Sequence, residues 1–430
     1  MLITMKDQLT IFQIKINNFI IMKKIILLCW VILVILSFVN NNLYAQGCVA
    51  VRQMGGTHAM FSSDSSGSSY NLNKGDLQVG VSYRYFHSWR HFVGDVEQPQ
   101  RQYTGGGIGT DGIDHGNAVN IYSHALDLNF SYALSNRWQI NVTLPYVHNE
   151  RSQVLKQIKP VVDTFRYSVF AQGLSDVRFS INYWLFDPAK VKKGNLMLGA
   201  GIKLNTGDCK AEDIAPQADG TKRFTIMDQA IQPGDGGVGY SLELQAFRQV
   251  YKSIYGFANG YYLFSPQTSN GTAKSAPTKG LEGYNVYACP DQYFVRAGVM
   301  ASIGNFTFSM AARTEGIPVN DVFGSSVAYR RPGYVWAIEP GITYRNGSHT
   351  LNLYVPYNFY KNRTQSAADI AAQNLQNEGV TDPSKMVNVH GDAAFADYSV
   401  SLGYAYRFVK APKKQAQHNF KMWNDIQKTN

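Results

Sequence analysis

Apolar and polar residues alternate along most of this chain with a period of two. The clearest case is segment 398–408, where one face carries Tyr398, Val400, Leu402, Tyr404, Tyr406 and Phe408, and the other carries Ser399, Ser401, Gly403, Ala405 and Arg407. Such alternation predicts a β-strand with one apolar face. That face would point into the core of a soluble sandwich, or toward lipid in a membrane barrel.

Twelve segments share this alternation and are bounded by turn residues. They are 76–86, 122–134, 138–148, 174–186, 195–205, 238–250, 253–264, 292–303, 305–313, 333–345, 349–360 and 396–408. Soluble strands usually have about five or six residues, whereas a tilted strand needs about nine to eleven to cross a bilayer. The lengths of these segments therefore favour a membrane. The glycines and Asn259 of segment 253–264 leave its facing ambiguous.

The connections between these segments alternate strictly between short and long. Short turns such as "SNR", "YK", "GN" and "NGS" alternate with long connections at 88–121, 149–173, 206–237, 265–291, 314–332 and 361–395. An even number of strands, with tight periplasmic turns and long extracellular loops, is typical of outer-membrane barrels. The sequence thus predicts an all-β fold: a closed antiparallel transmembrane β-barrel of about 12 strands over residues 76–408. We expect it in the outer membrane of a Gram-negative bacterium, surrounded by lipid.

The residues before the barrel have the layout of a secretory signal peptide. In "MKKIILLCWVILVILSFVNNNLYAQ", Lys23 and Lys24 precede about fifteen apolar residues, and Ala45 supplies a small cleavage-site residue. We expect the true start at Met22, an upstream extension and signal peptide over 1–45, and a periplasmic segment or plug over 46–75. An N-terminal membrane anchor is the alternative. "AQGC" also loosely resembles a lipoprotein cleavage box, which leaves acylation of Cys48 open.

The net charge of +10 is concentrated at the two ends of the chain. Residues 1–45 hold four Lys and one Asp, and residues 409–430 hold five Lys and one Asp. The body is therefore only weakly basic, and we expect no nucleic-acid partner. The basic tail at 409–430 is either a disordered extension or a docking segment for a periplasmic protein.

The polar faces of the predicted strands carry the candidate functional residues. The charged ones among them are Arg84, Asp127, Asp176, Arg178, Lys203, Glu243, Arg296, Arg313, Glu339, Asp397 and Arg407. Lining a lumen, they would tune which solutes pass. The alternative is that they pair with one another and brace the wall. Cys209 and Cys289 lie in long connections and form either a disulfide or two free thiols.

Catalytic and metal-binding signals are weak. For His87 and His91 in "HSWRH", no partnered carboxylate or serine can be identified from the sequence, so an interfacial girdle position is favoured. The Gly-rich "TGGGIGTDGIDHGN" has no helix after it to hold a phosphate. We expect no enzyme activity, cofactor or metal. The segment "AADIAAQNLQNEG" in the last long connection predicts a short helix.

Part of the chain resembles a family of outer-membrane barrels associated with the meta-cleavage pathway of phenol degradation. The resemblance rests on "ALDLNFSYALSNRWQINVTLPYVHNE", "GLSDVRFSINYWLF", "LMLGAGIKLNTGD" and "QPGDGGVGYSLELQAF". It covers about residues 122–265, and Asn205 stands where the family usually has Pro. The resemblance implies a channel for hydrophobic or aromatic compounds.

Two functions follow as expectations. The first is an outer-membrane channel or transporter for passive passage of small-molecule solutes, including hydrophobic or aromatic ones. The second is a non-conducting barrel that acts in surface binding or envelope assembly. An open lumen would favour the first, and a plugged lumen with projecting loops would favour the second.

Overall fold

The computed structural model describes residues 72–109 and 112–409. The predicted signal peptide, most of the predicted segment 46–75 and nearly all of the predicted tail, including Cys48, lie outside the described residues. Within these residues, no helix is long and apolar enough to cross a membrane.

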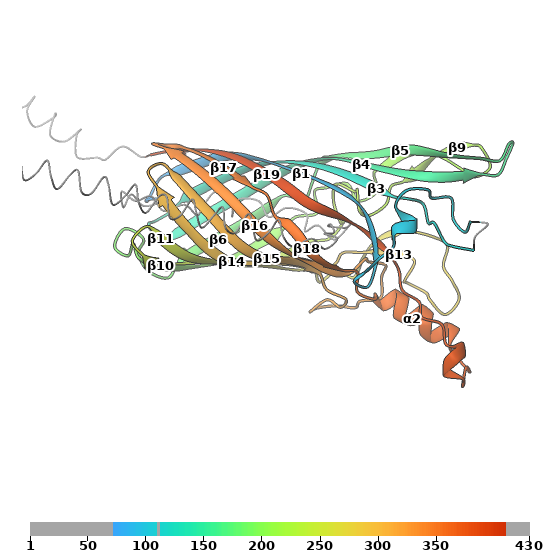
Figure 1. Cartoon of the computed structure of the whole chain (residues 1–430). Coiled ribbons are helices and arrows are strands. Elements are labelled where there is room, and N and C mark those ends of the chain that lie inside the picture. Colours follow the sequence, from blue (N-terminus) through green and yellow to red (C-terminus); the bar gives the residue numbers. More distant parts are fainter. Residues whose placement is uncertain (1–71, 110–111, 410–430) are drawn as a thin grey trace, which may run out of the picture. The chain divides into compact units, whose positions relative to one another are not determined.

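The described chain forms a closed antiparallel barrel of twelve strand positions (Figure 1). Its strands are β1 (Leu77–Val93), β3 (Asn120–Ala133), β4 (Trp138–Gln157), β5 (Asp163–Leu174), β6 (Arg178–Trp184), β7 (Gly194–Lys203), β10 (Gly239–Tyr251), β11 (Ile254–Phe264), β14 (Gln292–Ile303), β15 (Phe306–Ile317), β16 (Gly333–Asn346), β17 (His349–Tyr354), β18 (Tyr357–Asn362) and β19 (Ala393–Phe408). β5 and β6 share one position, as do β17 and β18. Neighbouring positions pair with each other, and β1 pairs with β19 from Leu77↔Phe408 onward. Closure removes the free sheet edge that lipid could not satisfy.

Two of the predicted strands are interrupted. The predicted strand 174–186 is interrupted at residues 175–177 and is shortened to β6, while Leu174 ends β5, which lies almost wholly in the predicted long connection 149–173. The interruption arises because Ser175 and Asp176 turn to other partners. The Ser175 hydroxyl donates to the Pro233 carbonyl, and the Asp176 carboxylate binds Lys203. The predicted strand 349–360 divides into β17 and β18 at Pro356, which has no N–H to donate to a ladder.

The two faces of the strands differ as the alternation predicts. On β3, Leu126 and Leu128 are each 43% exposed on the outside, while Asp127 between them is 7% exposed on the inside. On β19, Leu402 and Tyr404 are exposed outward, and Ser399 and Ala405 are buried. An apolar exterior and a polar interior are the pattern of a barrel in lipid.

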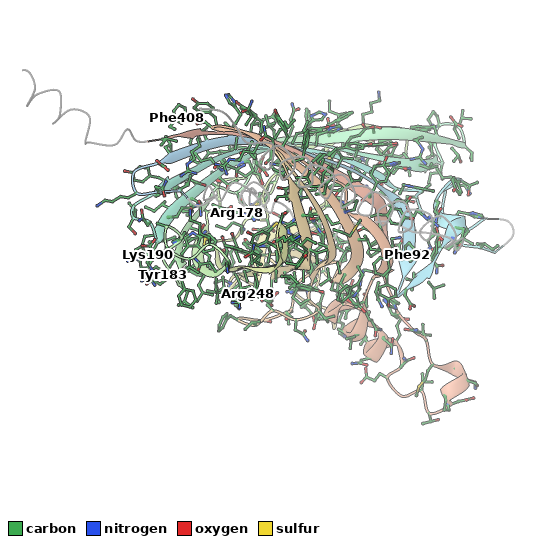
Figure 2. All side chains as sticks on the ribbon, turned by 60° about the vertical axis from the view of Figure 1, so that its left-hand side comes forward. Phe92, Arg178, Tyr183, Lys190, Arg248 and Phe408 are labelled. Atoms are coloured by element: carbon green, nitrogen blue, oxygen red, sulfur yellow. The ribbon has the colours of Figure 1, made fainter. Side chains whose placement is uncertain are left out.

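Aromatic side chains gather where the short turns join the strands. Trp138 packs on Tyr183 with ring centroids 4.5 Å apart, and Phe306 packs on Tyr344 at 4.8 Å. Tyr183 and Phe408 lie at this end of the barrel, and Phe92 lies toward the other (Figure 2). Such a girdle is typical of the membrane interface.

The long connections carry short elements of their own. These are β2 (Val96–Glu97), η2 (Pro99–Arg101), the hairpin of β8 (Glu212–Pro216) and β9 (Lys222–Ile226), the pair β12 (Ser269–Ala273) and β13 (Val286–Ala288), α2 (Ala367–Gln376) and η3 (Pro383–Lys385). The predicted helix is confirmed as α2. A capping box starts it: the Ser366 hydroxyl accepts from the Asp369 N–H, and the Asp369 carboxylate accepts from the Ser366 N–H.

Candidate functional site: the barrel interior

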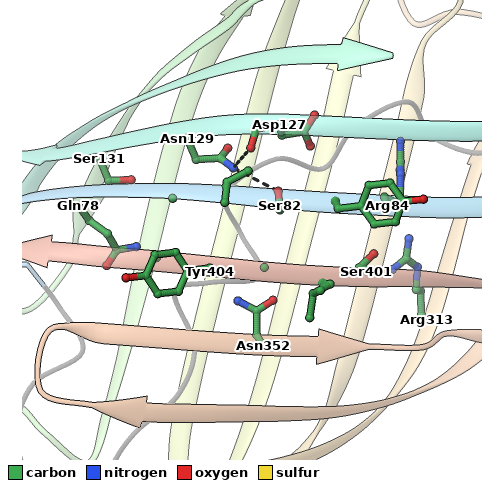
Figure 3. A pocket seen from close by; sticks show the side chains of 16 residues that line it. Gln78, Ser82, Arg84, Asp127, Asn129, Ser131, Arg313, Asn352, Ser401 and Tyr404 are labelled. Carbon is green, nitrogen blue, oxygen red and sulfur yellow. Dashed lines mark hydrogen bonds between the residues drawn. The ribbon is translucent and has the colours of Figure 1, made fainter. Parts of the chain in front are cut away.

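A small polar cavity lies on the inner wall where the first and last strands meet. Its volume is ≈ 50 Å³, and its inward-facing lining consists of Gln78, Gly80, Ser82, Arg84, Asp127, Asn129, Ser131, Arg313, Asn352, Ser401, Gly403 and Ala405 (Figure 3). Space exists here because small residues oppose each other across the closing pair: Gly80 faces Ala405, and Ser82 faces Gly403. A Cβ on Gly403 would come 2.6 Å from the Asn352 amide oxygen.

The polar groups of this wall are connected to each other. The Asn129 amide donates to the Ser82 hydroxyl and to the Asp127 carbonyl, each at 3.3 Å (Figure 3). The Thr143 hydroxyl donates to the Asn129 side-chain oxygen at 2.9 Å. This side of the interior is therefore ordered and hydrophilic.

Arg313, which lines the cavity, also belongs to a group of buried ion pairs that joins β14, β15 and β16. The Glu339 carboxylate binds two guanidinium groups, those of Arg296 and of Arg313, the latter at 2.5 Å. Arg313 also binds Glu315 at 2.8 Å. All four side chains are at most 5% exposed. One carboxylate thus links β14, β15 and β16 across the interior.

Four further charges complete a belt across the barrel. Arg84 lies in the field of Asp127, Glu315, Arg313 and Arg178. The Arg178 guanidinium donates to the Tyr261 hydroxyl at 3.2 Å. Glu243 lies close to Arg178, Ser180 and Asn182. We call the set Arg84, Asp127, Arg178, Glu243, Arg296, Arg313, Glu315 and Glu339 the charge belt.

The remaining predicted residues lie nearer the barrel ends. At the loop end, the Lys203 ammonium binds Asp176 at 3.1 Å and Asp235 at 2.5 Å, and donates to the Gly237 carbonyl. Asp397 lies 3.6 Å from Arg90. At the short-turn end, Arg407 binds Asp76 at 2.6 Å.

Seven of the eleven predicted residues therefore take part in ion pairs: Asp176, Lys203, Arg296, Arg313, Glu339, Asp397 and Arg407. Their partners Asp76, Asp235 and Glu315 were not among the predicted site residues. Glu315 was missed because β15 runs to Ile317, beyond the predicted end of that strand at Arg313. Asp235 was missed because it lies in the long connection between β7 and β10, which folds back to reach Lys203 on the inner wall.

An aromatic and apolar wall covers the inner faces of the strands from β6 to β14. Its buried members form three clusters: Trp184 and Met197; Phe257 and Met300 with Ala311; and Tyr261, Leu263 and Phe294. Phe247 packs against the first two. The Arg296 guanidinium lies 5.6 Å from the Phe257 ring centroid and 5.4 Å from that of Tyr354. This aromatic wall was not predicted, because only charged residues of the inner faces were considered as candidates for lining the lumen.

Of the two alternatives for the cysteines of the long connections, the structure has free thiols at both Cys209 and Cys289. Each sulfur packs against the glycine pair 236–237, and Cys289 donates to the Asp235 carbonyl at 3.3 Å. Burial raises the pKa of both thiols, more strongly for Cys289. Both groups therefore stay protonated near neutral pH.

The two histidines of "HSWRH" have structural partners. His87 stacks on Tyr122 with centroids 4.2 Å apart, and its Nε2 contacts the Asn120 amide oxygen at 2.9 Å. His91 is buried, with Nδ1 2.7 Å from Asp392. In the described part of the chain, no group of His, Cys, Asp and Glu is placed to hold a metal ion.

The loop ion pair of Asp228 and Arg331 should make the extracellular loops sensitive to strong acid. Their two parallel hydrogen bonds are both 2.8 Å long. Arg331 and Arg151 hold the pKa of the Asp228 carboxyl far below its usual value, despite burial. A lowered folded-state pKa contributes stability that is full above the unfolded value, about 4, and is lost as the pH falls.

We therefore expect amide exchange around Asp228 to be steady from pH 8 to pH 5 and to accelerate below about pH 4. Asp228→Asn should loosen the loop already at pH 7, by about 2 kcal/mol. Hydrogen exchange read by mass spectrometry measures both effects, with the exposed Glu378→Gln as control. An unchanged loop in Asp228→Asn would contradict this account.

No family model matches the chain, and no curated protein sequence matches it. The resemblance to the phenol meta-cleavage family thus stays a prediction.

The similar solved structures include outer-membrane channels and the barrel domains of autotransporters. They include a channel from Pseudomonas putida F1 (TM-score 0.45, 8% identity, covering 78% of this chain and 97% of that one). The P. putida toluene transporter TodX gives 0.39 and 10%, covering 86% and 100%. The CymD monoaromatic hydrocarbon channel gives 0.38 and 12%, covering 86% and 99%. Similarities this distant do not bear on the solute.

Proposed function

We propose that this chain is an outer-membrane channel for passive passage of small solutes that combine an aromatic or apolar part with a polar group. The observation that carries the proposal is the two-sided interior. The cavity wall of β1, β3 and β19 is polar and built from small residues, whereas the wall from β6 to β14 is aromatic. A solute with one face of each kind would find a partner on both sides.

The charge belt would act as the filter on this path. Arg84, Asp127 and Arg313 belong both to the charge belt and to the lining of the polar cavity. A solute in the cavity would therefore lie beside these charges. Rings of charged side chains set the selectivity of many pores. A twelve-stranded barrel has a lumen between the filled interior of eight strands and the water-filled pore of sixteen. Passage would be narrow and selective for size.

The polar cavity gives a direct test. Ser401→Trp places an indole in the cavity, whereas Val400→Trp, one residue earlier on the same strand, faces lipid. In proteoliposomes, influx of benzyl alcohol and benzoate should fall severalfold in Ser401→Trp and stay near the original rate in Val400→Trp. Equal influx in both variants would contradict passage along this wall.

One observation favours the alternative of a non-conducting, surface-binding barrel. Ion pairs join the loops to each other and to the wall, through Lys203 with Asp235 and Arg331 with Asp228. Loops held in this way could present a fixed surface to a partner. Absence of influx for every solute in the unmodified protein would support this alternative.

A further inference from the structure

The short-turn end of the barrel is strongly basic. We call residues 72–76, 134–137, 185–193, 248–253, 304–305, 345–348 and 407–409 the short-turn rim. The rim holds two acidic residues, Asp76 and Asp187, and nine basic ones: Lys74, Arg137, Lys190, Lys192, Lys193, Arg248, Lys252, Arg345 and Arg407. The six long connections at the other end hold 20 acidic and 16 basic residues. The barrel is thus electrically polarised along its axis.

Four of the five rim lysines are exposed and are not neutralised by the two acids. Lys74, Lys190, Lys193 and Lys252 are exposed, and none of them makes an ion pair within the residues that the structure describes. Asp76 is already bound to Arg407, and the Asp187 carboxylate accepts from a backbone N–H of its own turn. These four lysines therefore place exposed positive charge at this edge.

These cations lie at the level of the aromatic girdle. The Arg137 guanidinium is 4.4 Å from the Tyr183 ring centroid, and the Lys252 ammonium is 5.1 Å from that of Tyr251. Tyr183, Lys190 and Arg248 lie at the same end of the barrel as Phe408 (Figure 2). Aromatic rings at this depth occupy the headgroup region, and adjacent long cationic side chains reach the phosphates there.

The cations are also distributed around the barrel. They come from the segment before β1, the β3–β4, β6–β7, β10–β11 and β16–β17 turns, and the end of β19. A lipid leaflet surrounds a barrel and would meet all of these turns at once. An acidic peptide or protein would cover only one sector of the circle.

We propose that the short-turn rim binds the phosphate headgroups of anionic phospholipids in the periplasmic leaflet. The proposal rests on the barrel lying in a membrane and not on what passes through it. Phosphate groups pair with lysine and arginine, and clusters of such residues beside a membrane attract anionic lipid. The rim would thereby fix both the depth and the orientation of the barrel.

The test compares lipid preference in mixed vesicles of phosphatidylcholine and phosphatidylglycerol. Quenching of tryptophan fluorescence by the brominated form of each lipid gives their relative association with the barrel. The unmodified protein should prefer phosphatidylglycerol by about fivefold, and Lys190→Gln/Lys193→Gln/Lys252→Gln should bring the ratio close to one. High salt should have the same effect as the triple variant.

The matched control is Lys210→Gln/Lys222→Gln/Lys279→Gln, which removes the same charge from the long connections and should keep the preference. Single rim variants, checked for folding by circular dichroism, replace the triple variant if it does not fold. Equal ratios in rim and control variants would overturn the proposal. So would a rim-dependent affinity for an acidic cell-wall peptide in detergent without any lipid preference.

Discussion

Glu339→Gln should lower the free energy of unfolding by about 3–5 kcal/mol. The Glu339 carboxylate is 1% exposed and neutralises two guanidinium groups that are themselves nearly inaccessible. Removing its charge takes away the carboxylate that Arg296 and Arg313 share. An uncompensated buried charge costs more than the lost attraction, because the group remains desolvated. Urea titration of the protein folded into vesicles measures the change.

Glu315→Gln is the matched comparison, because Glu315 binds the same Arg313 guanidinium that Glu339 binds. It should cost clearly less than Glu339→Gln, since Arg313 then keeps Glu339. Equal losses of unfolding free energy in the two variants would mean that binding two guanidinium groups makes Glu339 no more important for stability than Glu315. No loss in either would mean that water in the lumen screens these charges.

Lys203→Met should destabilise the barrel by a similar amount, about 3–5 kcal/mol, and release a loop as well. Its ammonium is 2% exposed and joins Asp176 on the wall to Asp235 in the connection between β7 and β10. Without it, two buried carboxylates face each other. Limited proteolysis should then cut within residues 204–238, a segment that we expect to be resistant in the unmodified protein.

Lys222→Met is the control, because Lys222 is exposed on β9 in the same connection. It should leave both the unfolding free energy and the proteolysis pattern unchanged. Cleavage of the loop at equal rates in both variants would show that Lys203 does not hold it.

The barrel could be predicted from the sequence because the patterns that specify it lie within single strands and turns. Lipid on one side of every strand imposes a period of two, and the short turns at one end fix the alternation of connection lengths. The two broken strands show where local reasoning fails. Pro356 could have been recognised as a strand break from its missing N–H. Ser175 and Asp176 could not, because their partners Pro233 and Lys203 lie far away in sequence.

The site was only partly predictable. The charged residues of the inner face could be identified from the alternation along each strand, but three of their partners, Asp76, Asp235 and Glu315, were not. Asp235 comes from a loop, and its return to the wall depends on tertiary packing. The aromatic wall could have been predicted from the same alternation of inward-facing and outward-facing residues. Phe257 and Tyr261 alternate with exposed-face residues on β11, but the glycines of that strand obscured the pattern.

Single-channel conductance of the purified protein in planar bilayers tests the central claim most directly. A channel of this kind should give discrete, reproducible steps of low conductance, and benzoate should reduce them as it occupies the path. Silence of the folded protein under all conditions, with no influx of any solute into vesicles, would contradict the account and favour a surface-binding barrel.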